Sequence, residues 1–387
     1  MKKKMLIALM LFLMLPATAM AGSGYEGGFY VNNDDDSFRL TFNGRVQNQL
    51  YWQDRKDTTN TISFKLRRAM MGFHSKIAEK AFLGMWLMHA ASSVENTTFQ
   101  NVNVTGAVAG IEIIPAFVVT VGMVGLPLSF INEVSSAWIT LPEFPNVVTR
   151  DDTLSAITPL RSSFGTPDGL GINLSGSYWK WFYSLSVINS AESNYAVQTN
   201  TKAMSYGFRT GWNILDPVPG KLTDFECSDK PKLSLSIGTD YQSGRTDPNG
   251  AVIKYLWTSS AGIALRWAGF SFTSEGFYRR TNITAIPATV LWARPKLTDI
   301  GYYANAAYYI IPKKFEIAAQ ASQTIRQGPA NDSWEMGGGF NYYIFDNNLK
   351  LQLAYKMSRY FDWVAGTNAY SRQNAEHNIT LMLSAIF

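Results

Sequence analysis

The stretch that decides the fold is residues 38–52, which read FRLTFNGRVQNQLYW. Apolar side chains recur in this stretch with a period of two, from Phe38 to Trp52, and mostly polar or basic residues fill the positions between them. A period of two is typical of a β-strand whose two faces meet different environments. The stretch therefore predicts an antiparallel strand with one apolar and one polar face.

Extended segments of the same kind recur along the chain. The sixteen segments are 38–52, 62–77, 81–91, 106–114, 116–123, 170–178, 179–189, 204–214, 232–241, 260–268, 269–280, 300–310, 313–326, 334–345, 348–357 and 375–387. Many reach the length that a tilted strand needs to cross a bilayer, whereas strands of soluble sheets average about 5–6 residues. Because lipid offers the backbone no hydrogen-bond partner, such a sheet must close on itself. We predict an all-β fold, a closed antiparallel transmembrane β-barrel of sixteen strands over residues 38–387.

The composition favours an exported membrane barrel over a soluble domain. Charged residues make up 16% of the chain and aromatic residues 14%, whereas about 25% charged residues is typical of soluble domains. Residues 1–21 combine three lysines, an apolar run and a small-residue ending, which predicts a signal peptide cleaved after Ala21. Loss of Lys2, Lys3 and Lys4 would lower the formal net charge from +5 to +2. Residues 22–37 are then expected to form a periplasmic lead-in.

The last strand carries a candidate signal for insertion into the outer membrane. Counting back from Phe387, alternate positions form an apolar row that includes Leu383, Leu381 and Ile379. This pattern predicts recognition by the barrel-assembly machinery, although a terminal strand of a periplasmic sheet is an alternative. Candidates for the aromatic girdles in contact with outer-membrane lipid are Tyr51, Trp52, Trp179, Trp181, Trp212, Trp257, Trp267, Tyr302, Tyr303, Tyr308 and Tyr309.

One long irregular stretch, about 125–168, interrupts the alternation and contains Pro142, Pro145 and Pro159. A connection of that length is unusual unless it has a function. We predict that it folds into the lumen as a constriction loop. Its charged residues are Glu133, Glu143, Arg150, Asp151, Asp152, Arg161 and Asp168, so the loop is net acidic.

The face opposite the apolar residues is rich in basic side chains. The candidate pore-lining residues are Arg39, Arg45, Lys65, Arg67, Arg209, Arg266, Arg326, Lys350 and Lys356, and further basic residues on the same faces are Lys180, Lys232, Arg279 and Lys314. The acidic candidates are Asp240, Glu275, Glu316 and Glu335. A basic lumen would concentrate anions, but each charged residue could instead brace the wall through an ion pair.

Arg68 does not fit this pattern, because strict alternation with Phe64 and Leu66 would point it toward lipid. An arginine at the bilayer midplane costs about 2–4 kcal/mol. Arg68 is therefore expected to lie near a rim, to follow a β-bulge, or to face another subunit.

Several segments, in their order along the chain, resemble the phosphate-selective porin O and P family. They are Gly44-Arg45-Val46-Gln47, Phe64-Lys65-Leu66-Arg67-Arg68-Ala69, Ile113-Ile114-Pro115, Gly169-Leu170-Gly171-Ile172 and Phe340-Asn341-Tyr342-Tyr343. The resemblance spans nearly the whole mature chain and implies a homotrimer of sixteen-stranded barrels in the outer membrane of a Gram-negative bacterium.

We predict a porin that passes small hydrophilic solutes by passive diffusion with a weak preference for anions, phosphate and other inorganic anions being candidate permeants. The alternative is a structural or adhesive barrel with little conductance. An enzyme is disfavoured because the chain has three histidines, His74, His89 and His377, and no serine-nucleophile motif around them. The sequence predicts no cofactor, no metal site and no binding to nucleic acid.

Overall fold

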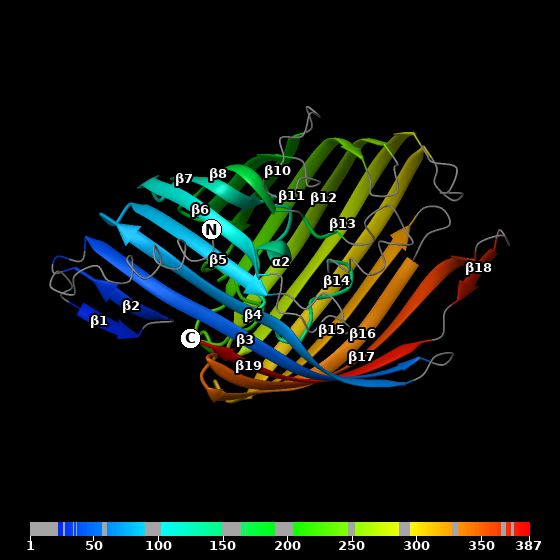
Figure 1. Ribbon diagram of the computed structural model, residues 1–387. Coiled ribbons are helices and arrows are strands. Elements are labelled where there is room, and N and C mark those ends of the chain that lie inside the picture. Colours follow the sequence, from blue (N-terminus) through cyan, green and yellow to red (C-terminus); the bar gives the residue numbers. More distant parts are fainter. Residues whose placement is uncertain are drawn as a thin grey trace, which may run out of the picture.

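The computed structural model describes residues 22–25, 28–33, 35, 37–55, 60–89, 102–148, 164–166, 168–189, 204–246, 252–285, 295–326, 332–364, 369–372 and 375–387. The expected signal peptide lies outside these residues. Within them, no helix has the length and apolar character needed to cross a membrane. The same ranges are organised almost entirely as a single antiparallel sheet (Figure 1).

Sixteen of the nineteen strands in these ranges form a closed barrel. They are β3 (Phe38–Arg55), β4 (Thr61–Ile77), β5 (Ala81–His89), β6 (Val102–Ile114), β7 (Phe117–Gly125), β8 (Asp168–Tyr178), β9 (Trp181–Asn189), β10 (Met204–Asn213), β11 (Lys232–Thr246), β12 (Val252–Trp267), β13 (Phe270–Ala285), β14 (Lys296–Ile311), β15 (Phe315–Arg326), β16 (Asp332–Phe345), β17 (Leu349–Val364) and β19 (Glu376–Ile386). β19 pairs with β3, with Leu381 opposite Leu50, and this pairing closes the sheet. The predicted sixteen-stranded antiparallel barrel is confirmed, and each predicted segment overlaps one barrel strand.

Alternation along each strand gives the barrel an apolar outer face and a polar inner face. On the outside, Phe64 is 85% exposed and Tyr302 and Tyr308 are each 47% exposed. The girdle prediction was wrong for Tyr303 and Tyr309, which lie inside the barrel and are only 1% and 2% exposed. Neighbouring residues of a strand point to opposite faces, so only one member of each Tyr-Tyr pair can reach lipid.

The two rims of the barrel differ in the length of their connections. One rim has the tight turns 78–80, 115–116, 179–180, 268–269, 312–314 and 346–348, which are typical of the periplasmic side. The C-terminus lies at this rim, where Phe387 exchanges backbone hydrogen bonds of 2.6 and 2.9 Å with Gly44.

The expected lead-in contains a hairpin, β1 (Gly22–Tyr25) and β2 (Phe29–Asn32), and β2 extends the sheet beside β3. β18 (Ala369–Arg372) is a short strand paired with the end of β17.

Two connections fold inward instead of remaining at a rim. The first joins β7 to β8, and its described parts, 126–148 and 164–166, lie inside the barrel with the single helical turn α2 (Phe130–Glu133) (Figure 1). The second, 214–231, joins β10 to β11. Together with wall residues, the two connections form a hydrophobic core in the lumen that includes Leu128, Val147 and Leu222. The described parts of the long loop lie in the lumen, as predicted.

Candidate functional site

The inward loop, defined here as residues 126–148 and 164–166, is attached to the wall by buried polar groups. Glu275 of β13 accepts hydrogen bonds from the backbone N–H groups of Phe130 and Ile131, at 2.7 and 3.0 Å, and from the hydroxyl of Tyr303 at 2.7 Å. Glu335 of β16 accepts one from the N–H of Asn146 at 2.6 Å. These contacts hold the loop against the half of the wall formed by β10 to β17.

Basic side chains of the wall hold the same loop. Lys350 donates to the carbonyl of Ala137 at 2.9 Å, and Arg45 donates to the hydroxyl of Ser135 at 3.2 Å. Arg209 pairs with the carboxylate of Glu133, and Lys356 lies 3.2 Å from that of Glu335. These four predicted lumen residues do face the interior, but each of them braces the loop or the wall.

The second inward connection, residues 214–231, is called the periplasmic segment here. Its Thr223 hydroxyl hydrogen bonds with Glu316 at 2.5 Å, and its Asp224 accepts hydrogen bonds from the N–H groups of Ser228 and Gly269. Arg266, which is fully buried, donates to the Lys221 carbonyl of this segment. Sequence reasoning did not anticipate this role, because residues 214–231 show no hydrophobic periodicity.

The remaining candidates are distributed as follows. The guanidinium of Arg39 stacks over the Tyr30 ring at 3.8 Å, and the ammonium of Lys65 over the Tyr51 ring at 4.2 Å. Arg150, Asp151, Asp152 and Arg161 lie outside the described residues. The His377 ring contacts the Tyr355 hydroxyl at 2.6 Å, and in the part of the chain that the structure describes His74 has no hydrogen bond to a serine or carboxylate.

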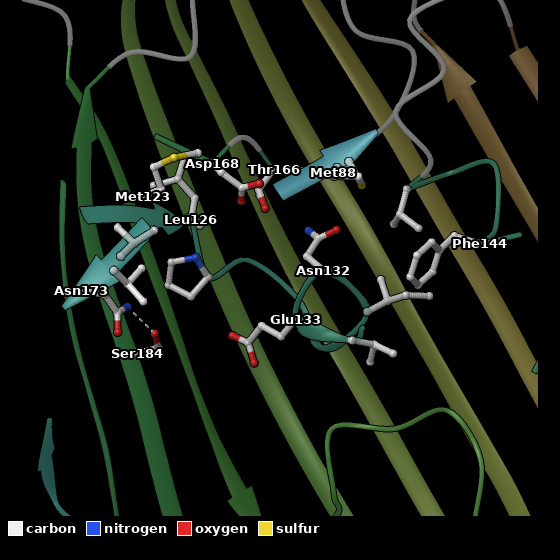
Figure 2. Close-up of a pocket in the computed structure, with 18 of the residues that line it drawn as sticks. Met88, Met123, Leu126, Asn132, Glu133, Phe144, Thr166, Asp168, Asn173 and Ser184 are labelled. Carbon is white, nitrogen blue, oxygen red and sulfur yellow. Dashed lines mark hydrogen bonds between the residues drawn. The ribbon is translucent and has the colours of Figure 1, made fainter. Parts of the chain in front are cut away.

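A cavity of about 740 Å³ remains between the inward loop and the wall formed by β4 to β9. Figure 2 shows α2 placing Asn132 and Glu133 in its middle, with Met123 and Leu126 on one side, Phe144 on the other, and Thr166 and Asp168 above. Asn173 and Ser184 line its wall on β8 and β9. Since the loop and the periplasmic segment fill much of the opposite half, this cavity is the candidate passage for solutes.

Arg67 and Arg68 line the cavity together, because a bulge in β4 changes the register between Gln47 and Asn48. Arg68 pairs with Gln47 in the sheet, Leu66 pairs with Asn48, and Arg67 is the extra residue. At a β-bulge, two consecutive side chains can point toward the same face of the sheet, which strict alternation does not allow. Of the three explanations expected for Arg68, the structure shows the β-bulge. Arg68 was not among the residues predicted to line the lumen.

Both arginines share one carboxylate, that of Glu143 in the inward loop. Arg67 makes a bidentate pair with it at 2.5 and 2.9 Å, and Arg68 lies 3.6 Å away and donates to Gln47 at 2.9 Å. Paired forks of this type are among the stronger ionic contacts in proteins. The cluster of Arg67, Arg68 and Glu143, called the arginine pair cluster here, carries a net charge of +1.

The pKa values of the two loop carboxylates that line the cavity are shifted in opposite directions. Burial raises the pKa of Glu143, but the hydrogen bond and charge of Arg67, with the charge of Arg68, outweigh it and lower that pKa to about 2. Burial also raises the pKa of Glu133, and there the charge of Arg209 does not compensate. Acidification should therefore neutralise Glu133 first, while Glu143 stays ionised.

We expect anion preference to increase as the pH falls from neutral toward about 4.5, the ordinary range of a glutamate. Glu133 then loses its negative charge while Arg209 keeps its positive charge. The zero-current potential of the purified protein, measured against pH in a planar bilayer under a potassium chloride gradient, checks this. The dependence should be absent in Glu133→Gln, and an unchanged pH profile in that variant would contradict the assignment.

A second arginine pair lies on the opposite part of the wall, against the inward loop. Arg279 and Arg326 share the carboxylate of Asp299, at 2.7 and 3.4 Å, and all three side chains are at most 4% exposed. The Arg279 guanidinium also stacks on the loop residue Phe164 at 4.6 Å. This cluster joins β13, β14 and β15 to the loop, so it is a structural brace.

Replacement of Asp299 by asparagine should destabilise the barrel, because it leaves two buried guanidinium groups without their shared carboxylate. Removing one partner of a buried ion pair typically costs about 3–5 kcal/mol. Urea unfolding in lipid vesicles, followed by tryptophan fluorescence, measures the change in free energy. Asp216→Asn, at an exposed aspartate of the periplasmic segment, is the control, and equal midpoints for both variants would disprove the expectation.

Solved structures share this architecture. OmpT of Vibrio cholerae, in its trimer form, is 10% identical, with 91% of this chain and 100% of that chain covered at a TM-score of 0.59. Salmonella typhi OmpF in complex with daunomycin is 13% identical, with 95% of this chain and 100% of that chain covered at a TM-score of 0.58. An anion-selective porin from Comamonas acidovorans is 9% identical, with 90% of this chain and 100% of that chain covered at a TM-score of 0.60. At such identities the likeness shows the fold, which is that of the outer-membrane porins.

The sequence identifies the family more directly. No curated protein matches the chain significantly, but residues 38–382 match the model of phosphate-selective porin O and P. The chain therefore belongs to the phosphate-selective porin O and P family, as the sequence motifs had indicated. It is a passive diffusion channel of the Gram-negative outer membrane, and its family and fold are known as non-enzymatic channels.

Proposed function

We propose that solutes cross this porin through the cavity between the inward loop and β4 to β9, and that the arginine pair cluster gives the passage a weak preference for anions. The observation that carries the proposal is that two arginines on the passage wall share one carboxylate. The net positive charge would raise the local concentration of anions. Inorganic anions, phosphate among them, are the expected permeants, and no cofactor or enzymatic step is required.

The test is a pair of substitutions at this cluster. Glu143→Gln leaves the positive charge of both arginines uncompensated, so the zero-current potential in a potassium chloride gradient should move toward the chloride potential. Arg67→Gln removes the net charge and should move it in the opposite direction. Lys313→Gln, at an exposed periplasmic turn, is the matched control. If both cluster variants keep the potential of the unmodified protein, selectivity is set elsewhere.

A structural barrel with little conductance remains a second candidate, and one observation favours it. The inward loop and the periplasmic segment pack into a continuous hydrophobic core inside the lumen. A single-channel recording separates the two candidates, since a structural barrel would show no discrete conductance steps.

We also infer that three copies assemble through the outer face of β4 to β8. Among the described residues from Ile62 to Ile172, the exposed large apolar side chains are aliphatic, methionine or phenylalanine, and none is tyrosine or tryptophan. From Tyr178 onward, exposed tyrosines and tryptophans are frequent. Girdle aromatics belong where a barrel meets lipid, so a face without them suits contact with protein. The trimer form of Vibrio cholerae OmpT supports this stoichiometry.

The remaining outer face is proposed to contact lipid, and the terminal strand to engage the barrel-assembly machinery. Ile379, Leu383 and Phe387 are each 42% exposed on the outside. This exposed row lies along the strand that closes the barrel and offers a surface that the assembly machinery could bind.

A further inference from the structure

The wall of the cavity is unusual for a passage used only by inorganic ions. Along β5 to β9, the charged residues among the described side chains are Glu112, beside a periplasmic turn, and Asp168, at the opposite rim. Between these two positions the inner face is glycine, aliphatic, aromatic, methionine, serine, threonine or asparagine. The passage therefore has one wall without charge.

Trp86 contributes a large apolar side chain to this wall. Its ring points inward, and a Cβ atom added at Gly72, Gly84 or Gly106 would lie only 2.5–2.7 Å from ring atoms. The three glycines therefore make room for the ring against the wall. Glycine in strand interiors often marks a close approach of this kind.

The cavity continues this apolar surface. The wall contributes Met88, Val108 and Val124, and the inward loop contributes Leu126, Ile131 and Phe144. Mostly apolar linings with a few polar groups, in volumes of about 300–1,000 Å³, are typical of sites for organic molecules.

The charged end of the cavity lies next to apolar side chains. Phe144 follows Glu143 directly, so an aromatic ring adjoins the arginine pair cluster. Met88 pairs with Met70, two positions from Arg68 on the same face of β4. Arg67 retains a side-chain exposure of 30% despite its pair with Glu143. An arginine fork at an apolar boundary suits a carboxylate attached to an apolar body.

Glu143 is paired within the arginine pair cluster, and the other acidic groups of the cavity lie elsewhere. The carboxylate of Glu133 is paired with Arg209, and Asp168 is at the rim where β8 begins. An organic cation would have to bind at these positions and would gain nothing from the arginine pair cluster. The arrangement therefore favours an anion over a cation of the same shape.

We propose that this cavity is a binding subsite for amphipathic organic anions, namely monocarboxylates with an aromatic or branched apolar body. The arginine pair cluster holds the carboxylate, and Phe144 and Met88 contact the apolar body. The proposal rests on the proposed function, since the solute must first enter the passage.

The test uses the purified, full-length assembly in planar bilayers carrying chloride current. Benzoate is the probe, acetate is the anion without an apolar body, and phenethylammonium is the cation with one. Benzoate should reduce the chloride current at concentrations about tenfold lower than acetate, because burial of its ring adds apolar contact. Phenethylammonium should have no effect below the concentration at which acetate acts.

Variants locate the effect. Met88→Asn and Arg67→Gln should each raise the benzoate concentration needed for half-block by about fivefold or more, as expected from loss of apolar contact and of the anion partner. Val118→Asn, an inward valine of β7 outside the cavity lining, should not. If benzoate acts no better than acetate while chloride current is normal, the subsite does not exist and the porin function stands. Stronger block by phenethylammonium would overturn the charge assignment, and absence of chloride current would overturn the porin function itself.

Discussion

Glu275→Ala should release the inward loop from the wall and raise both the conductance and the current noise of the open channel. Glu275 is 2% exposed and accepts three hydrogen bonds, two from the first turn of α2 and one from Tyr303. Each bond to a charged acceptor contributes about 1.5–3 kcal/mol. The loss also leaves two buried N–H groups of α2 unpaired.

The geometry around Glu275 supports a specific role in holding the loop. Gly262 lies opposite Glu275 in the sheet, and a Cβ atom at Gly262 would be 2.5 Å from its Cγ atom. The missing side chain leaves space for the carboxylate to reach the loop. Gly238 shows a similar adaptation, because a Cβ atom there would be 1.9 Å from the Leu128 carbonyl oxygen. The wall is therefore shaped to receive the loop backbone.

Single-channel recordings compare the variant with Asp240→Ala, which removes another carboxylate of the wall that is 2% exposed and accepts a hydrogen bond from Gln242 on its own strand. Both variants lose a buried acid, but only Glu275 holds α2. Resistance of the folded barrel to detergent at room temperature confirms that each variant is intact. Equal conductance and noise in the two variants would mean that Glu275 does not restrain the loop.

The barrel could be predicted because its determinants are local and repeated. A strand that crosses the bilayer must alternate, so residues 38–52 and the other extended segments carry their own signal. The less regular segments, such as 62–77 and 116–123, are also extended in character, and each overlaps a barrel strand. Alternation also placed the basic residues on the inner face. It could not distinguish Tyr302 from Tyr303, because an aromatic pair presents one ring to each side.

The partners of the inner residues could not be predicted, because they are distant in sequence. Glu143 lies 76 residues from Arg67, and Glu275 lies 145 residues from Phe130. No period or spacing relates such positions. The bulge that turns Arg68 inward depends on the register between β3 and β4, and the only sign of it in the sequence was that Arg68 violates alternation. The break in alternation at Arg68 was therefore a better indication of the arginine pair cluster than the regular alternation elsewhere.

The periplasmic segment shows a different limit of sequence reasoning. Residues 214–231 lack alternation, and no sequence pattern relates them to the inward loop. In the structure, Leu222 donates a backbone hydrogen bond to the carbonyl of Trp138 in the inward loop at 3.1 Å. The ring of Trp138 also packs edge-on against Phe225, with the ammonium of Lys221 at 3.8 Å from its centre. Trp138 therefore joins two segments that enter the lumen from opposite rims.

Replacement of Trp138 by alanine should uncouple these two segments and expose Cys227. Loss of a packed tryptophan costs about 3 kcal/mol or more, and a local opening that becomes 1.4 kcal/mol easier is tenfold more populated. Burial raises the pKa of the Cys227 thiol and so disfavours the reactive thiolate. We therefore expect maleimide to label the variant at least about tenfold faster than the unmodified protein.

Cys227 is the only cysteine of the chain, so its labelling rate, followed by mass spectrometry of the folded protein, needs no engineered thiol. Trp179→Ala is the matched control, because Trp179 is 75% exposed at a periplasmic turn and its loss removes the same side chain without touching the lumen. An unchanged rate in Trp138→Ala would show that the wall alone holds the periplasmic segment, and equally fast labelling in both variants would show that the effect is not specific to Trp138. Faster labelling confined to Trp138→Ala would mean that the inward loop and the periplasmic segment are restrained by each other, so that a change at one rim of the passage alters the other.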